Sequence, residues 1–282
     1  MSQSLSTDLS QTNSLADFTQ ETLALTKRLF IQLQRRPSTL IAGVVQPFIW
    51  LILFGALFAN APSGTFGNDA NYARFLAPGI IVFTAFSGAL NAGLPVMFDR
   101  EFGFLNRLLV APLASRYSIV AASTIYIVVL SFIQTAVIVL ASAAVGAGLP
   151  NVAGLGAIAL IVLLIVLGVT ALSLGLAFAL PGHIELIAII FVANLPLLFA
   201  STALAPLNFM TKWLQIIALA NPLTYAIEPI RYLYLHQDWG LTSIVLASPW
   251  FSISFAQVIV ILVMFDLFAL VAIQPLLRRR FA

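Results

Sequence analysis

Apolar runs of roughly 20 residues or more recur along this chain, and they constrain its fold more than any other feature. A run of that length crosses the ~30 Å hydrocarbon core of a bilayer as a single helix. Only 8% of the 282 residues are charged, whereas soluble domains carry about 25%. A membrane β-barrel would instead show alternating segments of about ten residues. The sequence therefore predicts an all-α polytopic membrane protein.

Six transmembrane helices are expected within a membrane domain of residues 37–282. They cover residues 39–59, 75–98, 117–145, 152–180, 184–204 and 250–275. The third and fourth spans are longer than a straight crossing needs, which favours tilt or projection beyond the bilayer.

Two segments precede the first span. Residues 1–15 are rich in Ser, Thr, Gln and Asn and lack the basic start and apolar stretch of a signal peptide, so we expect a disordered tail. Residues 16–36 are amphipathic, which favours a helix lying in the membrane interface over a soluble amphipathic helix. Its basic residues are Lys27, Arg28, Arg35 and Arg36. Pro37 predicts a break before the first span.

The placement of Lys and Arg predicts how the spans are oriented. Of the 13 basic residues, Arg74, Lys212 and Arg231 fall on one side of the predicted topology. The other ten are Lys27, Arg28, Arg35, Arg36, Arg100, Arg107, Arg116, Arg278, Arg279 and Arg280. Cytoplasmic loops carry the excess of basic residues. Both termini, residues 99–115 and the connection 181–183 are therefore expected in the cytoplasm, with residues 60–73 and 205–249 outside.

Residues 205–249 are too apolar for an ordinary outer loop. Three prolines divide the region into short pieces: Pro206, Pro222 and Pro229. Aromatic residues such as Trp213 and Tyr225 suit the headgroup boundary. We expect two short re-entrant helices, because non-helical backbone at that depth must be buried in protein or line a wet cavity.

Charged residues near or within the membrane have specific expected roles. Glu228 and Arg231 are three residues apart and are expected to pair, holding the outer region together in preference to gating. Asp266 lies midway along the last span, where a lone charge costs about 2.5–3.5 kcal/mol. We expect Asp266 to face protein or a cavity, in a structural role in preference to a substrate or proton role. Glu185 is interpreted as a solvated end charge.

Motifs for catalysis are absent from the sequence. An ATPase phosphate loop needs G-x-x-x-x-G-K-[ST], but Lys27 and Lys212 each follow a threonine. His183 and His236 fall on opposite sides of the predicted topology, which argues against a histidine metal site. The chain has no cysteine, so disulfide and thiolate chemistry are excluded. We expect no enzyme activity, no catalytic, cofactor or metal residue, and no nucleic-acid partner.

A charged, amphipathic segment, residues 99–113, separates the second and third spans. Asp99 and Glu101 are expected to open a short cytoplasmic helix, where they would complement the helix dipole, and Pro112 to end it. Its apolar residues at helical spacing are Phe102, Leu105, Leu108 and Leu109. A separate motor protein could grip such a helix; the alternative is a connecting loop with an interfacial helix.

Three stretches resemble the permease subunits of type-2 ABC exporters, a family of drug-resistance, polysaccharide and lipid exporters. Asp99-Arg100-Glu101-x-Gly103 through Leu108-Leu109-Val110-Ala111-Pro112-Leu113 resembles the segment after the family's second span. Asn221-Pro222-Leu223-Thr224-Tyr225-Ala226, with Glu228 and Arg231, resembles the stretch before the last span. Ala205-Pro206-Leu207 with Trp213-Leu214 resembles the start of the outer re-entrant pieces. The resemblance covers residues 20–280, and Asn106, Met210 and Pro229 depart from the family's pattern.

The resemblance implies a mechanism and partners. Two permease chains would pair, each bound to an ABC ATP-binding subunit that holds ATP and Mg, while this chain holds no cofactor. Residues 99–113 would be the coupling helix seated in that subunit, through Asp99, Arg100, Glu101, Phe102, Gly103, Leu105, Arg107, Leu108 and Pro112. The outer region would be built by Pro206, Trp213, Asn221, Pro222, Tyr225, Glu228 and Arg231. Lys27, Arg28, Arg35 and Arg36 would add a second contact with the subunit, or bind anionic lipid at ~1 kcal/mol per residue.

The expected function is that of a homodimeric exporter permease in the bacterial plasma (inner) membrane, with a plastid or thylakoid membrane as the alternative. The cargo would be an amphipathic drug-like molecule or a lipid, moved along the interface between two chains that involves the first, second and fifth spans. Export of lipid-linked polysaccharide is the alternative cargo. A stand-alone, gradient-driven transporter would need polar groups deep in several spans, and the sequence offers mainly Asp266, Asn91, Gln134 and Asn194.

Overall fold

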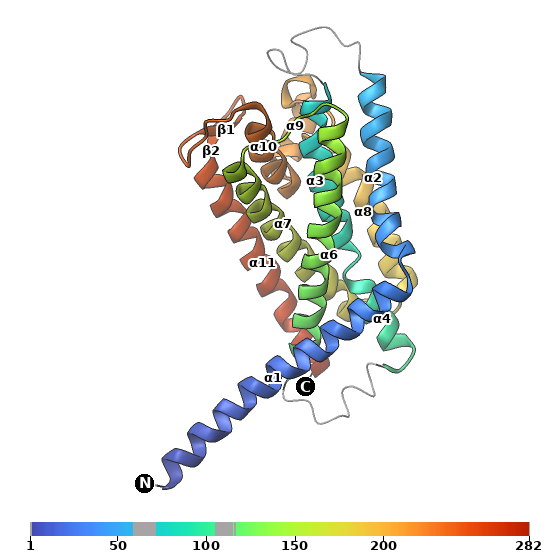
Figure 1. The fold of residues 1–282 in the computed structure, drawn as a ribbon, viewed down its shortest axis with the longest axis vertical. Helices are drawn as coiled ribbons and strands as arrows, with labels where there is room; N and C mark the ends of the chain where they lie inside the picture. Colours follow the sequence, from blue (N-terminus) through green and yellow to red (C-terminus); the bar gives the residue numbers. More distant parts are fainter. Residues whose placement is uncertain (1, 59–71, 105–114, 116, 282) are drawn as a thin grey trace.

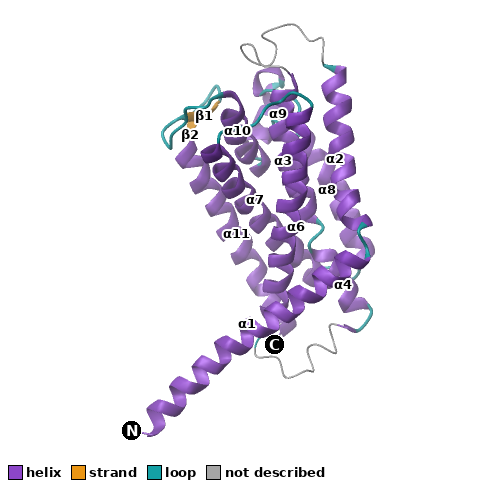
Figure 2. Ribbon diagram, viewed as in Figure 1, coloured by secondary structure: helices purple, strands orange, loops and turns teal. Residues whose placement is uncertain are grey.

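The structure is a computed structural model that describes residues 2–58, 72–104, 115 and 117–281. Helices stand side by side in one bundle, and α1 crosses its lower end (Figures 1 and 2). The helices are α1 (Ser2–Arg35), α2 (Ser38–Leu57), α3 (Tyr72–Leu90), α4 (Gly93–Glu101), α6 (Tyr117–Ala144), α7 (Val152–Ala179), α8 (His183–Phe199), α9 (Lys212–Ala220), α10 (Pro222–Leu235) and α11 (Phe255–Phe281). A 3-10 turn η1 (Leu207–Phe209) and two antiparallel strands, β1 (Ile244–Ala247) and β2 (Ser252–Ser254), complete the described elements.

Within the described residues, 5 helical segments are long and apolar enough to cross a membrane. They are α2, α3 together with α4, α6, α7 and α11. The predicted fifth span corresponds to α8, a shorter apolar helix of 17 residues that ends at Phe199 instead of residue 204. Seventeen residues is the lower limit of bilayer-crossing lengths. The helical class is therefore confirmed, and the count of six spans stays a prediction.

The centre of the bundle is α3, which is buried along nearly its whole length. Helices α2, α6, α7 and α10 pack around it, and α11 lies along α7 (Figure 1). By contrast, α2 buries only Pro47 and Leu51. The outer helices therefore present wide apolar surfaces, as expected where lipid or another membrane chain replaces water.

The N-terminal segment differs from the expected disorder of residues 1–15, because α1 runs without interruption from Ser2 to Arg35. Extending an existing helix costs far less than nucleating one, so the amphipathic part can continue into a polar stretch. Near its C-terminal end, α1 packs against α6, where the ring centroids of Phe30 and Tyr126 are 5.3 Å apart. The break predicted at Pro37 is confirmed, since α1 ends at Arg35 and α2 begins at Ser38.

The second predicted span is broken in the structure between Leu90 and Gly93. The Ser173 hydroxyl of α7 bridges the break. It donates to the Leu90 carbonyl at 2.6 Å and accepts from the Gly93 N–H at 2.9 Å. The free backbone groups of a broken helix must find partners at membrane depth. The Ser173 hydroxyl is the partner of both the Leu90 carbonyl and the Gly93 N–H, so α7 stabilises the break in the span.

The outer region contains the two short helices expected there, α9 and α10, and their entry into the outer leaflet stays a prediction. The β1–β2 hairpin was not predicted, and it delays the start of α11 to Phe255, where residue 250 was expected. Strands of four and three residues are too short to give a recognisable alternation in the sequence.

Candidate functional site

Asp99, in the last turn of α4, pairs with Arg28 of α1. The two guanidinium nitrogens of Arg28 donate to the two carboxylate oxygens at 2.9 and 2.8 Å. The same guanidinium lies over the Phe104 ring, 3.8 Å from its centroid. Bidentate pairs of this kind are stronger and more directional than single ion pairs. This contact fixes α1 to the end of α4.

Arg100, the next residue, binds the end of α7. It donates to the carbonyls of Ala177, Leu180 and Pro181 at 2.8, 2.6 and 2.6 Å. The last carbonyls of a helix have no partner within that helix, and a basic side chain there also complements the helix dipole. Arg100 therefore caps α7 from outside.

Glu101 binds the start of α8. Its carboxylate accepts the His183 backbone N–H at 2.6 Å and is also hydrogen-bonded to His183 Nδ1. Gly182, the N-cap residue of α8, has no side-chain cap of its own. A Cβ at Gly182 would lie 3.0 Å from Glu101 Oε1, so glycine leaves room for this carboxylate. Glu101 thus places a negative charge at a helix N-terminus, where it is favourable.

These contacts define the α4 junction, made of Arg28, Asp99, Arg100, Glu101 and His183. Three consecutive residues at the end of one helix bind three other helices, α1, α7 and α8. A force applied beyond Glu101 therefore reaches four elements together. The sequence indicated that this segment matters, but it gave no sign of these partners, which lie about 70–80 residues away.

The prediction that Asp99 and Glu101 open a new helix is wrong. They close α4, whose backbone bonds continue to Phe102, and Gly103 then adopts a positive φ of 75°. Carboxylates at a helix C-terminus oppose its dipole, and their partners in the α4 junction offset this cost. Phe102 is exposed. The predicted coupling residues Leu105, Arg107, Leu108 and Pro112 lie outside the described residues.

The four predicted basic residues of α1 do not share one environment. Arg28 is half-buried in the α4 junction, whereas Lys27, Arg35 and Arg36 are exposed. Among the residues that the structure describes, Arg28 is thus the one of the four that binds the α4 junction.

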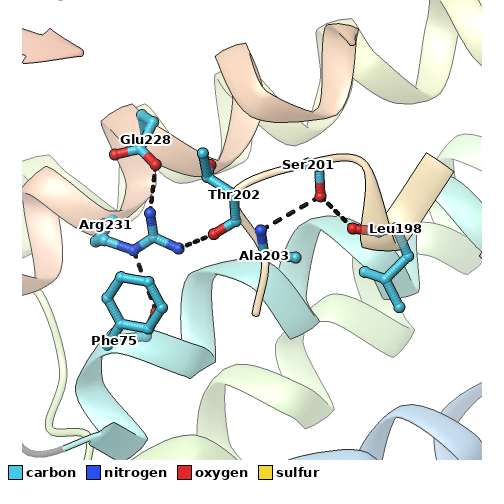
Figure 3. Close-up of polar contacts among 7 residues, drawn as sticks. All are labelled: Phe75, Leu198, Ser201, Thr202, Ala203, Glu228 and Arg231. Carbon is cyan, nitrogen blue, oxygen red and sulfur yellow. Dashed lines mark hydrogen bonds and ion pairs between the residues drawn. The ribbon is translucent and has the colours of Figure 1, made fainter. Parts of the chain in front are cut away.

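A second polar centre surrounds Arg231 of α10 (Figure 3), and α10 lies at the other end of the bundle from α4 (Figure 1). Arg231 is buried and paired with Glu228, which confirms the predicted pair. It also donates to the Phe75 carbonyl at 3.2 Å and to the Thr202 carbonyl, and it lies 3.9 Å from the Phe75 ring centroid. One side chain thereby joins α10, α3 and the turn after α8.

Asn221 fixes the same turn from its other side. Its side-chain oxygen accepts the Leu223 N–H at 3.0 Å and caps α10. Its amide nitrogen donates to the carbonyls of Leu197 and Ala200, both at 2.7 Å. Asn221 therefore serves the start of α10 and the end of α8 at once. Nearby, the Tyr225 hydroxyl donates to the Leu219 carbonyl at 2.6 Å.

The remaining predicted residues of the outer region take other positions. Pro206 precedes η1, and Pro222 is the first residue of α10, where its missing N–H costs nothing. Trp213 is exposed on α9.

Asp266 lies on the buried face of α11, as expected for a charge within a span. A Cβ at Gly168 of α7 would lie 2.4 Å from its Oδ1, so this glycine makes room for the carboxyl group. Among the residues that the structure describes, Oδ1 has no hydrogen-bond partner.

Comparison with known proteins decides the family. The profile of the ABC-2 type transporter family matches residues 20–235. This chain belongs to that family. The protein named as transport permease ycf38 in Cyanophora paradoxa is 54% identical over 264 residues, which cover 94% of this chain and 91% of the relative. Its counterpart in Porphyra purpurea is 55% identical, covering 93% and 90%.

A more distant relative is named for drug resistance. The doxorubicin resistance ABC transporter permease protein DrrC of Mycobacterium tuberculosis (strain CDC 1551 / Oshkosh) is 26% identical over 219 residues, 76% of each chain. Membership makes the chain a multi-pass membrane permease without an ATPase site of its own. An ATP-binding partner subunit is implied by the same membership.

Proposed function

We propose that this chain is the membrane subunit of an ATP-driven exporter for an amphipathic drug-like molecule or a lipid. The observation that carries the proposal is the α4 junction, where the segment expected to touch the motor is bound to α1, α7 and α8. Two copies would pair, and each would bind one ATP-binding subunit through residues 99–113. Closure of the two motors would then move the spans as rigid bodies.

The proposed membrane arrangement has six spans with both termini in the cytoplasm. The α4 junction then lies at the cytoplasmic side and the Arg231 centre at the outer side, because they occupy opposite ends of the bundle. The proposed location is the bacterial plasma membrane, with a plastid or thylakoid membrane as the alternative. The relatives in Cyanophora paradoxa and Porphyra purpurea support the alternative.

The alternative cargo is a lipid-linked polysaccharide. The drug-resistance name of the Mycobacterium tuberculosis relative favours a drug-like cargo over a polysaccharide. A gradient-driven transporter without a motor is disfavoured by family membership.

The test is to co-express the chain with the ATP-binding protein encoded beside it and to measure ATP hydrolysis by the purified complex. We expect a stable two-plus-two complex whose activity falls strongly in Glu101→Lys, because the reversed charge would face the positive end of α8. Asp17→Lys is the control for charge reversal, since Asp17 is exposed on α1 and away from the start of α8. Failure to bind any ATP-binding protein, or equal activity of the Glu101 variant and its control, would refute the proposal.

A further inference from the structure

The β1–β2 hairpin ends in an exposed aromatic tip. Trp250 and Phe251, next to the turn between the strands, are 53% and 43% exposed, and Ile244 at the start of β1 is 58% exposed. The hairpin lies at the end of the bundle away from both chain termini (Figure 1). Large apolar side chains exposed at the turn and at the open end of one short hairpin mark an interaction surface.

The tip forms three hydrogen bonds of its own, all between Ser248 and Phe251. The Ser248 N–H donates to the Phe251 carbonyl at 2.9 Å, and the Ser248 hydroxyl donates to the same carbonyl at 2.7 Å. The Phe251 N–H donates back to the Ser248 hydroxyl at 3.0 Å. Pro249 has no N–H to satisfy. These bonds reduce the number of backbone groups that would lose hydrogen bonds to water on entering lipid, which lowers the cost of burying the turn.

The hairpin also carries no charge. From Trp239 to Phe265 the sequence contains no Asp, Glu, Lys, Arg or His. An uncharged segment avoids the large cost of placing an ionised group in a bilayer. Asp238, immediately before this stretch, is exposed and marks where polar surface begins.

The position of the hairpin identifies its partner. Phe255 begins α11, the last candidate span, directly after β2, so the tip lies at the level where the apolar span starts. The exposed apolar surface of α11 continues from there through Val260, Val263 and Met264. The other side of the hairpin is already covered, because Val245, Leu246 and Ile253 are buried. Trp side chains are enriched at the boundary between lipid and water.

We propose that the β1–β2 hairpin inserts Trp250 and Phe251 into the interfacial region of the outer lipid leaflet. The hairpin packs on α10 through β1 and on α11 through β2. Lipid at the tip is therefore in mechanical contact with the helix that carries Arg231. This inference rests on the membrane orientation proposed above, with this end of the bundle outside, and it does not depend on the cargo or the motor.

The chain has no cysteine, so one introduced thiol can be followed without a background. Trp250→Cys and Phe251→Cys would be reconstituted in phosphatidylcholine–phosphatidylglycerol vesicles and treated with a charged, membrane-impermeant maleimide. Asp238→Cys is the matched aqueous control on the same side. Because the thiolate is the reacting form, we expect the two tip thiols to react at least about tenfold more slowly than the control.

A second measurement separates lipid from protein as the covering partner. Tryptophan emission of the wild-type chain and of Trp250→Phe would be compared in vesicles of ordinary lipid and of lipid brominated near the headgroup. We expect the Trp250 signal, taken as the difference, to lose roughly half of its intensity to the brominated lipid and little to aqueous iodide.

Two results would overturn the proposal. Tip thiols that react as fast as Asp238→Cys, with emission quenched by iodide, would place the tip in water. Tip thiols that are protected while brominated lipid leaves the emission unchanged would mean that protein, such as a second copy of the chain, covers the hairpin.

Discussion

At the scale of single residues, the end of the bundle around Arg231 depends on side chains that each satisfy several backbone groups. Arg231 can reach Phe75, Thr202 and Glu228 because a guanidinium presents donors in a fixed planar fork. A lysine at this position could not reproduce this geometry. The residue is therefore expected to be required as arginine and not only as a positive charge.

Arg231→Lys should lower the stability of the protein by about 1–3 kcal/mol, because buried carbonyls lose their donors. Arg231→Leu should cost more, about 3–5 kcal/mol, since it leaves Glu228 unpaired in a largely buried position. Thermal unfolding of the purified chain in detergent measures both changes. Lys212→Leu is the control, because Lys212 is exposed, and an equal loss of stability there would contradict the prediction.

Sequence reasoning predicted the contacts at this scale only where they are local. The Glu228–Arg231 pair follows from a spacing of three residues on one helix. The partners of Arg231 at Phe75 and Thr202, and of Asp99 at Arg28, depend on how distant helices pack. No periodicity or capping rule carries that information.

At the scale of elements, the break between α3 and α4 gives the central span two segments that meet α7 closely. A Cβ at Gly93 would lie 2.5 Å from the Ser173 carbonyl, so α4 approaches α7 at a distance that only glycine allows. The end of α4 is then placed beside the end of α7, where Arg100 binds. The close approach thus positions the α4 junction.

Ser173→Ala should destabilise the protein by about 1–3 kcal/mol, because the Leu90 carbonyl and the Gly93 N–H both lose their partner. Ser123→Ala is the matched control. Ser123 is also buried, but its hydroxyl only adds to a helical carbonyl four residues earlier, that of Ile119. Unfolding in detergent compares the two variants, and a loss for Ser123→Ala as large as for Ser173→Ala would contradict the assigned bridge.

Sequence patterns located most of these elements because long apolar runs and Pro37 leave few alternatives. They failed where a boundary depends on tertiary contacts. Helix α4 continues to Glu101 because Arg28 of α1 and the start of α8 bind the carboxylates of Asp99 and Glu101 in its last turn. The break at Leu90 is held by a serine that is 83 residues away in the sequence. Both the end of α4 and the break at Leu90 therefore depend on residues that are distant in the sequence.

At the scale of the whole molecule, exposed apolar side chains lie on two separate surfaces, and lipid need not cover both of them. Both α2 and α8 flank α3 and leave large side chains exposed, among them Leu53 and Val192. α11 exposes Met264 from a position along α7. The proposed dimer uses the first, second and fifth spans, so it would cover the α2 and α8 surfaces and leave α11 to lipid.

Disulfide cross-linking tests this arrangement, again without native thiols. Leu53→Cys and Val192→Cys are each expected to yield covalent dimers in membranes under mild oxidation. Met264→Cys is expected to remain monomeric, although Met264 is about as exposed as Leu53. Dimers formed by Met264→Cys alone would place the second copy on the opposite side.

The central claim is that the α4 junction carries motor motion into the bundle, and the ion pair of Arg28 and Asp99 allows a direct test. The measurement is ATP hydrolysis by the reconstituted complex with its ATP-binding subunit, compared for Arg28→Asp, Asp99→Arg and the double variant that exchanges the charges. Lys27→Asp, a neighbouring exposed position, is the control for altered charge on α1.

Each single variant places like charges opposite one another and should lower the hydrolysis rate markedly at unchanged complex yield, whereas the double variant should recover most of it. Lys27→Asp should leave the rate near that of the wild type. Single variants with wild-type rates, or a double variant no better than the worse single variant, would contradict a role for this contact in coupling.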